Sequence, residues 1–233
     1  MTVKISVIIP CLNSAARLMP LLAGLVDGTA TGLIKQVIFA DGGSDDITAE
    51  IAEEVGADFV STPKGRGRQC KIAVIYAKAE WLLFLHDDCQ LAQGWEDELM
   101  GFINEAENQN KCAYFRFKLD DKSLKAKFVG WGVYWRCKIF GLPYGDQGLL
   151  IGRELYEKIG GFSSLPIMED VDIIGRIKAE IGKQNLLMLD SVLTTSADKY
   201  KTGYFKRIMR NFKYLMSYKL GKDPKKIAES YYK

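Results

Sequence analysis

The sequence predicts an α/β fold of Rossmann-like type, in which helices flank a mostly parallel central sheet. Short apolar runs rich in β-branched residues alternate with segments whose apolar residues repeat at helical spacing. The run at residues 5–9 is apolar at every position except Ser6, which indicates a strand buried on both faces. This alternation of strand and helix is typical of βαβ units.

Four apolar strands are predicted in the first half of the chain, at residues 5–9, 36–40, 58–61 and 81–85. Helices are predicted between them, and Ser14 is a suitable N-cap for the first. The third of these helices is predicted over 69–79.

The second half is less regular. We expect a strand, an aromatic helix, a loop with a short strand, a helix opened by acidic residues and a last strand, at 112–119, 122–140, 145–152, 169–181 and 192–196. The aromatic residues of the 122–140 helix are expected to pack in the core, and the alternatives are that they stack on a sugar or meet lipid.

Length and composition predict one ordinary globular domain. The chain has 233 residues, of which 48% are hydrophobic and 26% are charged. We expect a single domain over 1–233, with a core at 1–198 and a basic helical tail at 199–233. No run reaches the roughly 18 apolar residues of a membrane span, and the N-terminal residues show no secretory signal. The five cysteines form no CxxC pair, which favours reduced thiols and a cytoplasmic protein.

Charge is distributed unevenly along the chain. Residues 199–233 contain 11 Lys/Arg and 2 Asp/Glu, a net of +9, so residues 1–198 carry a net of −6. An acidic body argues against binding of nucleic acid by the core, and a basic tail predicts an anionic partner.

The tail is amphipathic when it is drawn as a helix. Five apolar residues share one face: Phe205, Ile208, Phe212, Leu215 and Met216. Three basic residues share another: Lys206, Arg210 and Lys213. The pattern fits a helix lying on anionic membrane lipid, for example at the inner face of the membrane, and it fits a helix docked on the body about equally.

Polar clusters follow three of the predicted strands, at residues 10–13, 41–46 and 86–88. Ligands of open α/β sheets bind beyond the carboxyl ends of the strands. We therefore expect the three clusters to converge at one edge of the sheet and to form the functional site.

His86, Asp87 and Asp88 come directly after a buried strand. Adjacent carboxylates repel each other unless a cation joins them, and hard oxygen ligands suit Mg²⁺ or Mn²⁺. A solvated turn in which an aspartate caps the next helix is the alternative, and the local pattern does not separate the two.

Two further loops could hold a nucleotide. Asp41 could accept hydrogen bonds from a base or a ribose, and the neighbouring glycines would let the backbone approach a ligand. Residues 64–69 place basic side chains before a helix, which suits a diphosphate. The alternatives are an ordinary βα loop in which Asp45 or Asp46 caps the helix, and an exposed basic loop.

Glu169 and Asp170 begin a predicted helix far along the chain. One of them could serve as a general base, a role worth about 10²–10⁴-fold in rate. The alternative is that they only complement the helix dipole.

Taken together, these segments resemble the family 2 glycosyltransferases with the GT-A fold, and in particular a bacterial subgroup. The matching segments keep their order along the chain: residues 6–13, 41–46 (DGGSxD), 65–69 (GRxxQ), 86–88 (HDD for the subgroup's HAD), 145–147, 160–162 and 168–171 (MEDV).

The resemblance implies inverting transfer of a sugar, of hexosyltransferase type, from a UDP- or GDP-sugar to an acceptor hydroxyl. It implies nucleotide contacts from Pro10, Asn13, Asp41, Gly43, Arg66, Gln69 and Asp87. It implies that Asp88, with His86 or Asp87 as a second ligand, binds Mn²⁺ or Mg²⁺. Asp170 would be the catalytic base supported by Glu169, and Asp146 and Gln147 would lie on the acceptor side.

The sequence departs from the family pattern in two places. Gly42 stands where many members carry a second aspartate. The segment 196–200 lacks the arginine of the subgroup's aromatic-basic motif, so we assign no diphosphate contact there.

Two other functions remain open at the level of sequence. A sugar nucleotidyltransferase would need a glycine-rich, arginine-containing loop after the first strand, and residues 10–17 contain no glycine. A non-catalytic nucleotide-binding protein would have no use for Asp170 beside an acidic metal pair.

Overall fold

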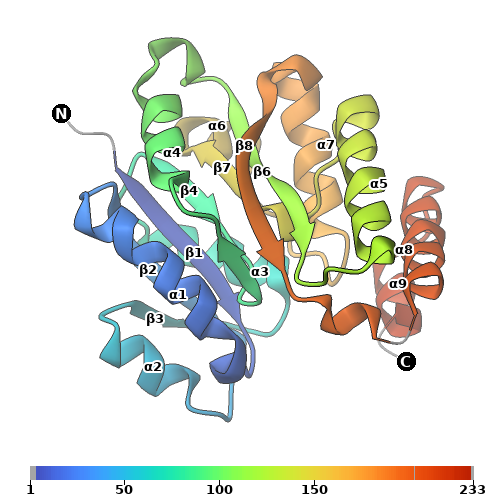
Figure 1. Ribbon diagram of the computed structural model, residues 1–233, viewed down its shortest axis with the longest axis horizontal. Helices are drawn as coiled ribbons and strands as arrows, with labels where there is room; N and C mark the ends of the chain where they lie inside the picture. The colour runs from blue at the N-terminus through green and yellow to red at the C-terminus, as the bar shows by residue number, and fades with distance from the viewer. Residues whose placement is uncertain (1–3, 202, 232–233) are drawn as a thin grey trace.

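The computed structural model describes residues 4–201 and 203–231, which are built around one eight-stranded sheet (Figure 1). The strands are β1 (Ile5–Cys11), β2 (Ile34–Asp41), β3 (Asp58–Ser61), β4 (Trp81–Phe84), β5 (Cys89–Leu91), β6 (Cys112–Leu119), β7 (Leu149–Gly152) and β8 (Leu186–Thr195). Their spatial order is β3-β2-β1-β4-β7-β6-β8-β5. Four of the strand pairings in the described residues are parallel and three are antiparallel, which confirms the predicted fold class.

Helices cover both faces of the sheet (Figure 1). One face carries α1 (Ala15–Ala30), α2 (Thr48–Glu54) and α4 (Trp95–Asn104). The other carries α3 (Arg66–Tyr76), α5 (Leu124–Phe140), α6 (Arg153–Lys158) and α7 (Glu169–Ile181). Short 3₁₀ helices occur at η1 (Ala106–Asn108), η2 (Gly145–Gln147), η3 (Lys183–Asn185) and η4 (Ala197–Tyr200). The chain continues into α8 (Tyr204–Lys219) and α9 (Pro224–Tyr231), which lie beside α5 at one side of the molecule.

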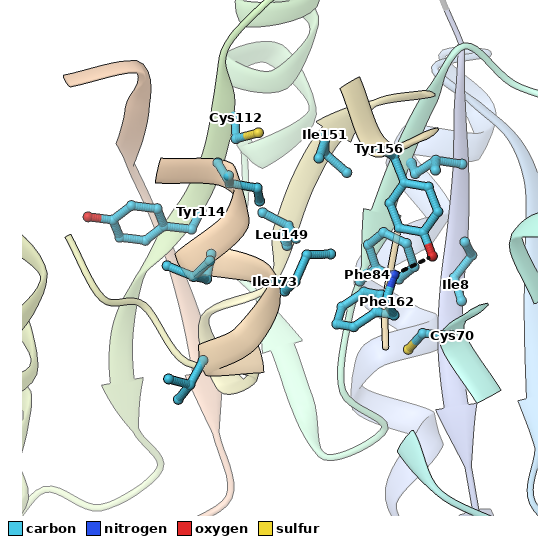
Figure 2. Close-up of a cluster of buried hydrophobic side chains, with 14 of the residues drawn as sticks. Ile8, Cys70, Phe84, Cys112, Tyr114, Leu149, Ile151, Tyr156, Phe162 and Ile173 are labelled. Atoms are coloured by element: carbon cyan, nitrogen blue, oxygen red, sulfur yellow. Dashed lines mark hydrogen bonds between the residues drawn. The ribbon is translucent and has the colours of Figure 1, made fainter. Parts of the chain in front are cut away.

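The two faces of the sheet support two separate hydrophobic cores. Ile8 packs on the side of α3 and α7, whereas Val7 and Ile9 pack on the side of α1. Because both faces are buried, β1 is apolar except at Ser6, whose hydroxyl donates to Gln36 Oε1 at 3.0 Å. Figure 2 shows the first core, in which Phe84 packs edge-on against Phe162 with ring centroids 4.9 Å apart.

The parallel strands bring three loops together. Cys11 pairs with Asp41 at the ends of β1 and β2, and Ile8 pairs with Phe84 at the end of β4. The clusters that follow these strands therefore lie at one edge of the sheet, and the predicted convergence is confirmed.

The predicted aromatic helix exists, but its predicted packing is wrong. The side of α5 that faces the sheet consists of small and medium residues: Ala126, Val129, Val133 and Cys137. The exposed aromatic residues of the helix are Phe128, Trp131, Trp135 and Phe140. The tight contact with the sheet selects small side chains, so the aromatic rings point outward.

Several element boundaries also differ from the predictions. Helix α3 begins at Arg66, three residues earlier than predicted, and β8 begins at Leu186 rather than 192. Helix α4 and the three-residue strand β5 were not predicted. In the described residues no helix is both long enough and apolar enough to cross a lipid bilayer.

Candidate active site

The loop after β2 is organised by Asp41, whose side chain is buried. One carboxylate oxygen accepts the backbone N–H of Gly43 at 2.8 Å and of Ser44 at 2.9 Å, and the other accepts the Ser44 hydroxyl. Asp41 thus fixes the shape of its own loop. Its predicted contact with a nucleotide stays a prediction.

The loops after β1 and β2 are joined through Asn13. Its backbone lies in the left-handed region, with φ of 50°. The Asn13 N–H donates to Ser44 Oγ at 2.8 Å, and Asn13 Oδ1 accepts the Asp45 N–H at 3.0 Å. Asp46 adds a second link, since its carboxylate accepts the N–H groups of Ala15 and Thr48 at the starts of α1 and α2. The bond to the Thr48 N–H fits the alternative expectation, in which Asp45 or Asp46 caps the following helix.

Asp87 is held by the first turn of α1. Arg17 Nη2 lies 2.6 Å from Asp87 Oδ2, and the Ser14 hydroxyl donates to the same oxygen. Ser14 precedes α1 as expected, but its side chain does not cap the helix. Asp87 therefore links the end of β4 to the start of α1, whereas the neighbouring Asp88 has a different partner.

Asp88 points toward the segment that follows β8. Its Oδ2 accepts Lys199 Nζ at 2.7 Å, while its buried Oδ1 has no hydrogen-bond partner. The backbone supports this approach, because the Ser196 N–H donates to the Asp88 carbonyl oxygen at 3.0 Å. A buried carboxylate oxygen without a partner is a costly arrangement unless a cation or a proton satisfies it.

His86 is buried beside Asp88. Its Nδ1 lies 4.0 Å from Asp88 Oδ1, and neither ring nitrogen has a hydrogen-bond partner. Burial, reinforced by the charges of Arg66 and Lys199, holds the pKa of His86 well below its usual 6.5. The imidazole is therefore neutral at pH 7 and keeps one lone pair for a ligand.

Asp146 brings a third carboxylate to this centre. Its Oδ1 is buried without a partner, and burial raises the pKa of Asp146. The negative charges of Asp170 and Asp88 raise it further, whereas Arg136 and Lys199 lower it. Crowded carboxylates of this kind are stabilised by a shared proton or a bound cation.

Gln147 is buried beneath this centre, and its side-chain amide is engaged by the protein. Arg136 Nη2 donates to Gln147 Oε1 at 2.9 Å, and Gln147 Nε2 donates to the Phe115 carbonyl at 3.3 Å. The guanidinium of Arg136 also stacks on the ring of Tyr144 at 3.6 Å. In this structure Gln147 braces the loop that carries Asp146, and its predicted acceptor-side role stays a prediction.

The start of α7 presents Glu169 and Asp170. Asp170 Oδ2 accepts the Gly145 N–H at 3.0 Å, and its Oδ1 accepts the Val171 N–H at 2.7 Å. Glu169 lies 3.4 Å from Arg66; burial and the charge of Asp170 raise the pKa of Glu169, and Arg66 opposes them. Met168 precedes the helix with φ of 65°, a strained conformation of the kind that clusters at functional sites.

Gln69 has a role in the sheet. Its side-chain N–H groups donate to the carbonyl oxygens of Cys11 at 2.8 Å and of Ala40 at 2.7 Å. A Cβ at Gly42 would lie 3.1 Å from Gln69 Nε2, so glycine leaves room for this side chain. Gln69 therefore holds the ends of β1 and β2 together, and its predicted contact with a nucleotide stays untested.

A small pocket opens between β4 and α7, with a cavity volume of about 40 Å³. Its floor is apolar and includes Phe84 and Phe162, and its polar lining comes from Arg66, His86, Glu169, Asp170 and the backbone of Gly145. Pro10 also lines it. The pocket thus unites several predicted site residues, whereas Asp41 and Asp88 lie beside it rather than in its wall.

The residues present fit a hard divalent cation. Among the residues that the structure describes, no group of three His, Cys, Asp or Glu side chains is arranged to hold a metal by itself. Mg²⁺ and similar ions commonly take only one or two carboxylates and complete their shell with water and substrate phosphates. The unpartnered Asp88 Oδ1 suits that mode.

Two residues of this centre were missed in the sequence. Lys199 falls in the segment from which we excluded a diphosphate contact because it lacks an arginine, yet a lysine carries the same charge. Arg17 could have been found only through its spacing from Ser14 on the first turn of α1. Both contact aspartates more than 65 residues away in sequence, which a local pattern does not reveal.

A mixed sheet whose parallel strands end in acidic loops beside a pocket is the architecture of a nucleotide-binding α/β enzyme. Residues 6–150 match the family model described as glycosyl transferase family 2, and the chain belongs to that family. It is 31% identical over 120 residues to an uncharacterized glycosyltransferase of Rickettsia bellii, a match covering 51% of this chain and 39% of that protein. The chain thus spans well under two thirds of the length of this relative.

Solved structures share the fold at lower identity. S. aureus TarS matches with a TM-score of 0.63 and 17% identity, over 89% of this chain and 38% of that one. Mannosyl-3-phosphoglycerate synthase from Rubrobacter xylanophilus matches with a TM-score of 0.62 and 13% identity. The match covers 94% of this chain and 76% of that one. Glucosyl-3-phosphoglycerate synthase from Mycobacterium tuberculosis, solved with Mn²⁺ and UDP-glucose, matches with a TM-score of 0.59 and 18% identity. The match covers 83% of this chain and 69% of that one.

Proposed function

We propose that this protein is an inverting hexosyltransferase that moves a sugar from a UDP- or GDP-sugar to an acceptor hydroxyl. One observation carries the proposal: Asp88 holds a buried, unpartnered oxygen at the end of β4, and Asp170 places a second carboxylate on the wall of the adjacent pocket. The first suits a cation on the donor diphosphate, and the second suits a base. The Mn²⁺ and UDP-glucose bound by the M. tuberculosis enzyme support the same kind of donor here.

Asp170 acts as the base in this proposal. Two backbone N–H groups orient its carboxylate, one on each oxygen, and each oxygen keeps a lone pair for the acceptor hydroxyl. The hydroxyl oxygen bonds to the anomeric carbon, the bond from that carbon to the diphosphate oxygen breaks, and the hydroxyl proton passes to Asp170. Attack on the face opposite the nucleotide inverts the anomeric centre.

The donor diphosphate is held by charge. A bound Mn²⁺ or Mg²⁺ would neutralise negative charge on the departing nucleotide diphosphate. Asp88 would hold the ion through Oδ1, with the neutral His86 next to it. Lys199 and Arg66 place positive charge on two sides of the same region and would attract the phosphates. Asp41, Asn13 and Gly43 would lie at the nucleoside end.

The proposal is tested by assaying release of nucleoside diphosphate from UDP- and GDP-sugars with Mn²⁺. We expect Asp170→Asn to lower turnover by about 10²–10⁴-fold while donor binding is retained. Asp88→Ala is expected to abolish the Mn²⁺-dependent part of the thermal shift that UDP or GDP produces. The exposed Asp27 on α1 provides the control, Asp27→Asn, which should leave both readouts unchanged.

Two results would reject the proposal. One is equal turnover in wild type and Asp88→Ala. The other is release of inorganic pyrophosphate from a nucleoside triphosphate and a sugar phosphate, which would identify a nucleotidyltransferase instead.

A further inference from the structure

The outer side of α5 carries an exposed apolar stripe. Five residues spaced three or four apart form it: Leu124, Phe128, Trp131, Trp135 and Ile139, with 45–81% of their surface exposed. The stripe lies opposite the buried residues of the same helix because the two sets are half a turn apart. Large exposed aromatic stripes are uncommon on soluble monomers and indicate a binding surface.

Helix α8 carries a second stripe of the same kind. Its inward side is anchored by tyrosines: Tyr214 donates to the Ser230 carbonyl at 2.6 Å, and Tyr204 donates to Asp121. Its outward side, continued by Leu220 directly after the helix, exposes five apolar residues, each 39–80% accessible: Phe205, Met209, Phe212, Met216 and Leu220. Leu215, which the sequence placed on the apolar face, packs against the core instead.

The two helices lie next to each other and share one charge pattern (Figure 1). Helix α5 contains four Lys/Arg and α8 contains five, and neither contains an Asp or a Glu. In the rest of the chain acidic residues outnumber basic ones, as the total of 32 Lys/Arg and 29 Asp/Glu requires. Aromatic and basic residues are therefore concentrated together on one side of the molecule.

We propose that the α5 stripe and the α8 stripe form a surface that binds anionic lipid bilayers. Trp and Phe favour the boundary between headgroups and acyl chains, and basic residues near an anionic membrane are attracted to its surface charge. A second copy of this chain is a poor occupant, because pairing the surface with itself would bring together the cationic groups of both helices, among them Lys206, Arg210 and Lys213, and neither helix carries an anionic side chain to offset them. Neither helix is apolar enough to cross the bilayer, so both lie in its interface.

The surface adjoins the candidate active site. Helix α5 leads through Gly141 into Pro143, Tyr144 and Gly145, which line the pocket, and α8 begins shortly after Lys199. The proposal does not depend on the proposed function, since lipid binding is measured without turnover.

The test is binding of the purified protein to phosphatidylcholine vesicles with and without about one third phosphatidylglycerol. We expect binding only to the anionic vesicles, and weaker binding at high salt. The double substitutions Trp131→Ser/Trp135→Ser and Phe205→Ser/Phe212→Ser should each weaken partitioning by roughly tenfold or more. Lys206→Glu/Lys213→Glu should do the same.

A matched control uses exposed apolar residues on another helix. Met19 and Val26 on α1 are each 60% exposed, and Met19→Ser/Val26→Ser should bind vesicles as wild type does. Brominated lipids give a second readout, because Trp131 and Trp135 are exposed whereas the other two tryptophans, Trp81 and Trp95, are buried. Quenching of fluorescence in wild type and its loss in Trp131→Ser/Trp135→Ser would place α5 in the lipid.

Three results overturn the proposal. The first is absence of binding to anionic vesicles. The second is wild-type binding by either aromatic variant, which would reduce the contact to charge attraction alone. The third is concentration-dependent self-association that the same variants abolish while vesicle binding is unchanged, which would identify a second copy as the occupant.

Discussion

At the residue scale, the chemistry of the site depends on side chains whose protonation is set by burial. His86 is the clearest case, because its pKa is held well below 6.5 by burial and by the charges of Arg66 and Lys199. Below that pH the unfolded chain binds a proton that the folded chain does not. Stability is therefore fully present above about pH 6.5 and decreases as the pH falls further.

We expect the free energy of unfolding to fall between about pH 7.5 and pH 5.5, and to fall less in His86→Gln. Urea denaturation of both proteins at the two pH values measures the difference. An identical decrease in wild type and variant would show that other groups account for the pH dependence, and would contradict the assignment of a neutral imidazole.

The sequence predicted an acidic pair at 87–88, but it could not show that the two aspartates have different partners in the fold. Asp87 is held by Arg17 and Ser14, and Asp88 by Lys199, and all three partners are distant in sequence. Such long-range contacts depend on tertiary packing, which local pattern does not encode. The predicted roles of both aspartates in binding a donor remain to be measured.

At the element scale, α3 packs closely against the start of α7 and the loop that precedes it. A Cβ at Gly67 in α3 would lie 2.4 Å from the Ser163 carbonyl oxygen and 2.9 Å from Glu169 Cβ. Backbone cannot yield as a flexible side chain does, so any larger residue must push α3 away from the start of α7.

We expect Gly67→Ala to destabilise the protein by about 1–3 kcal/mol through overpacking. Gly101 in α4 is the matched control, since a Cβ there meets nothing within 4 Å. Gly101→Ala should stabilise the protein by about 0.5–1 kcal/mol, because alanine is the better helix former. Urea melts measure both, and a Gly67→Ala protein as stable as wild type would contradict the packing described here.

The elements predicted best were those buried on both faces. The strands near 5–9 and 81–85 are apolar apart from Ser6 because helices cover both sides. Strand β5 has only three residues, too few for a periodic signal, and the first part of β8 was missed. The position of α5 was predicted correctly, but the wrong face of the helix was predicted to be buried. Aromatic residues are usually buried, whereas here small residues face the core.

At the scale of the whole molecule, burial extends to every cysteine. All five thiols are buried and unpaired, and burial raises the pKa of each. A buried, protonated thiol does not act as a nucleophile.

We therefore expect no cysteine to react with Ellman's reagent at pH 8 in the native protein, and five to react in concentrated guanidinium. Absorbance of the released thiolate measures the number of reacted cysteines. The rate of the reaction in the native protein reports how often the core opens. Rapid reaction of one equivalent without denaturant would show that the core opens locally at that cysteine.

One close contact lies where the two halves of the sheet meet. A Cβ at Gly145 would lie 2.6 Å from His86 Nε2, so the loop before β7 closes directly over the imidazole that follows β4. The two positions cannot diversify independently: a bulkier residue in the loop requires a smaller one after the strand. Relatives that keep a ring at the second position should therefore keep glycine at the first.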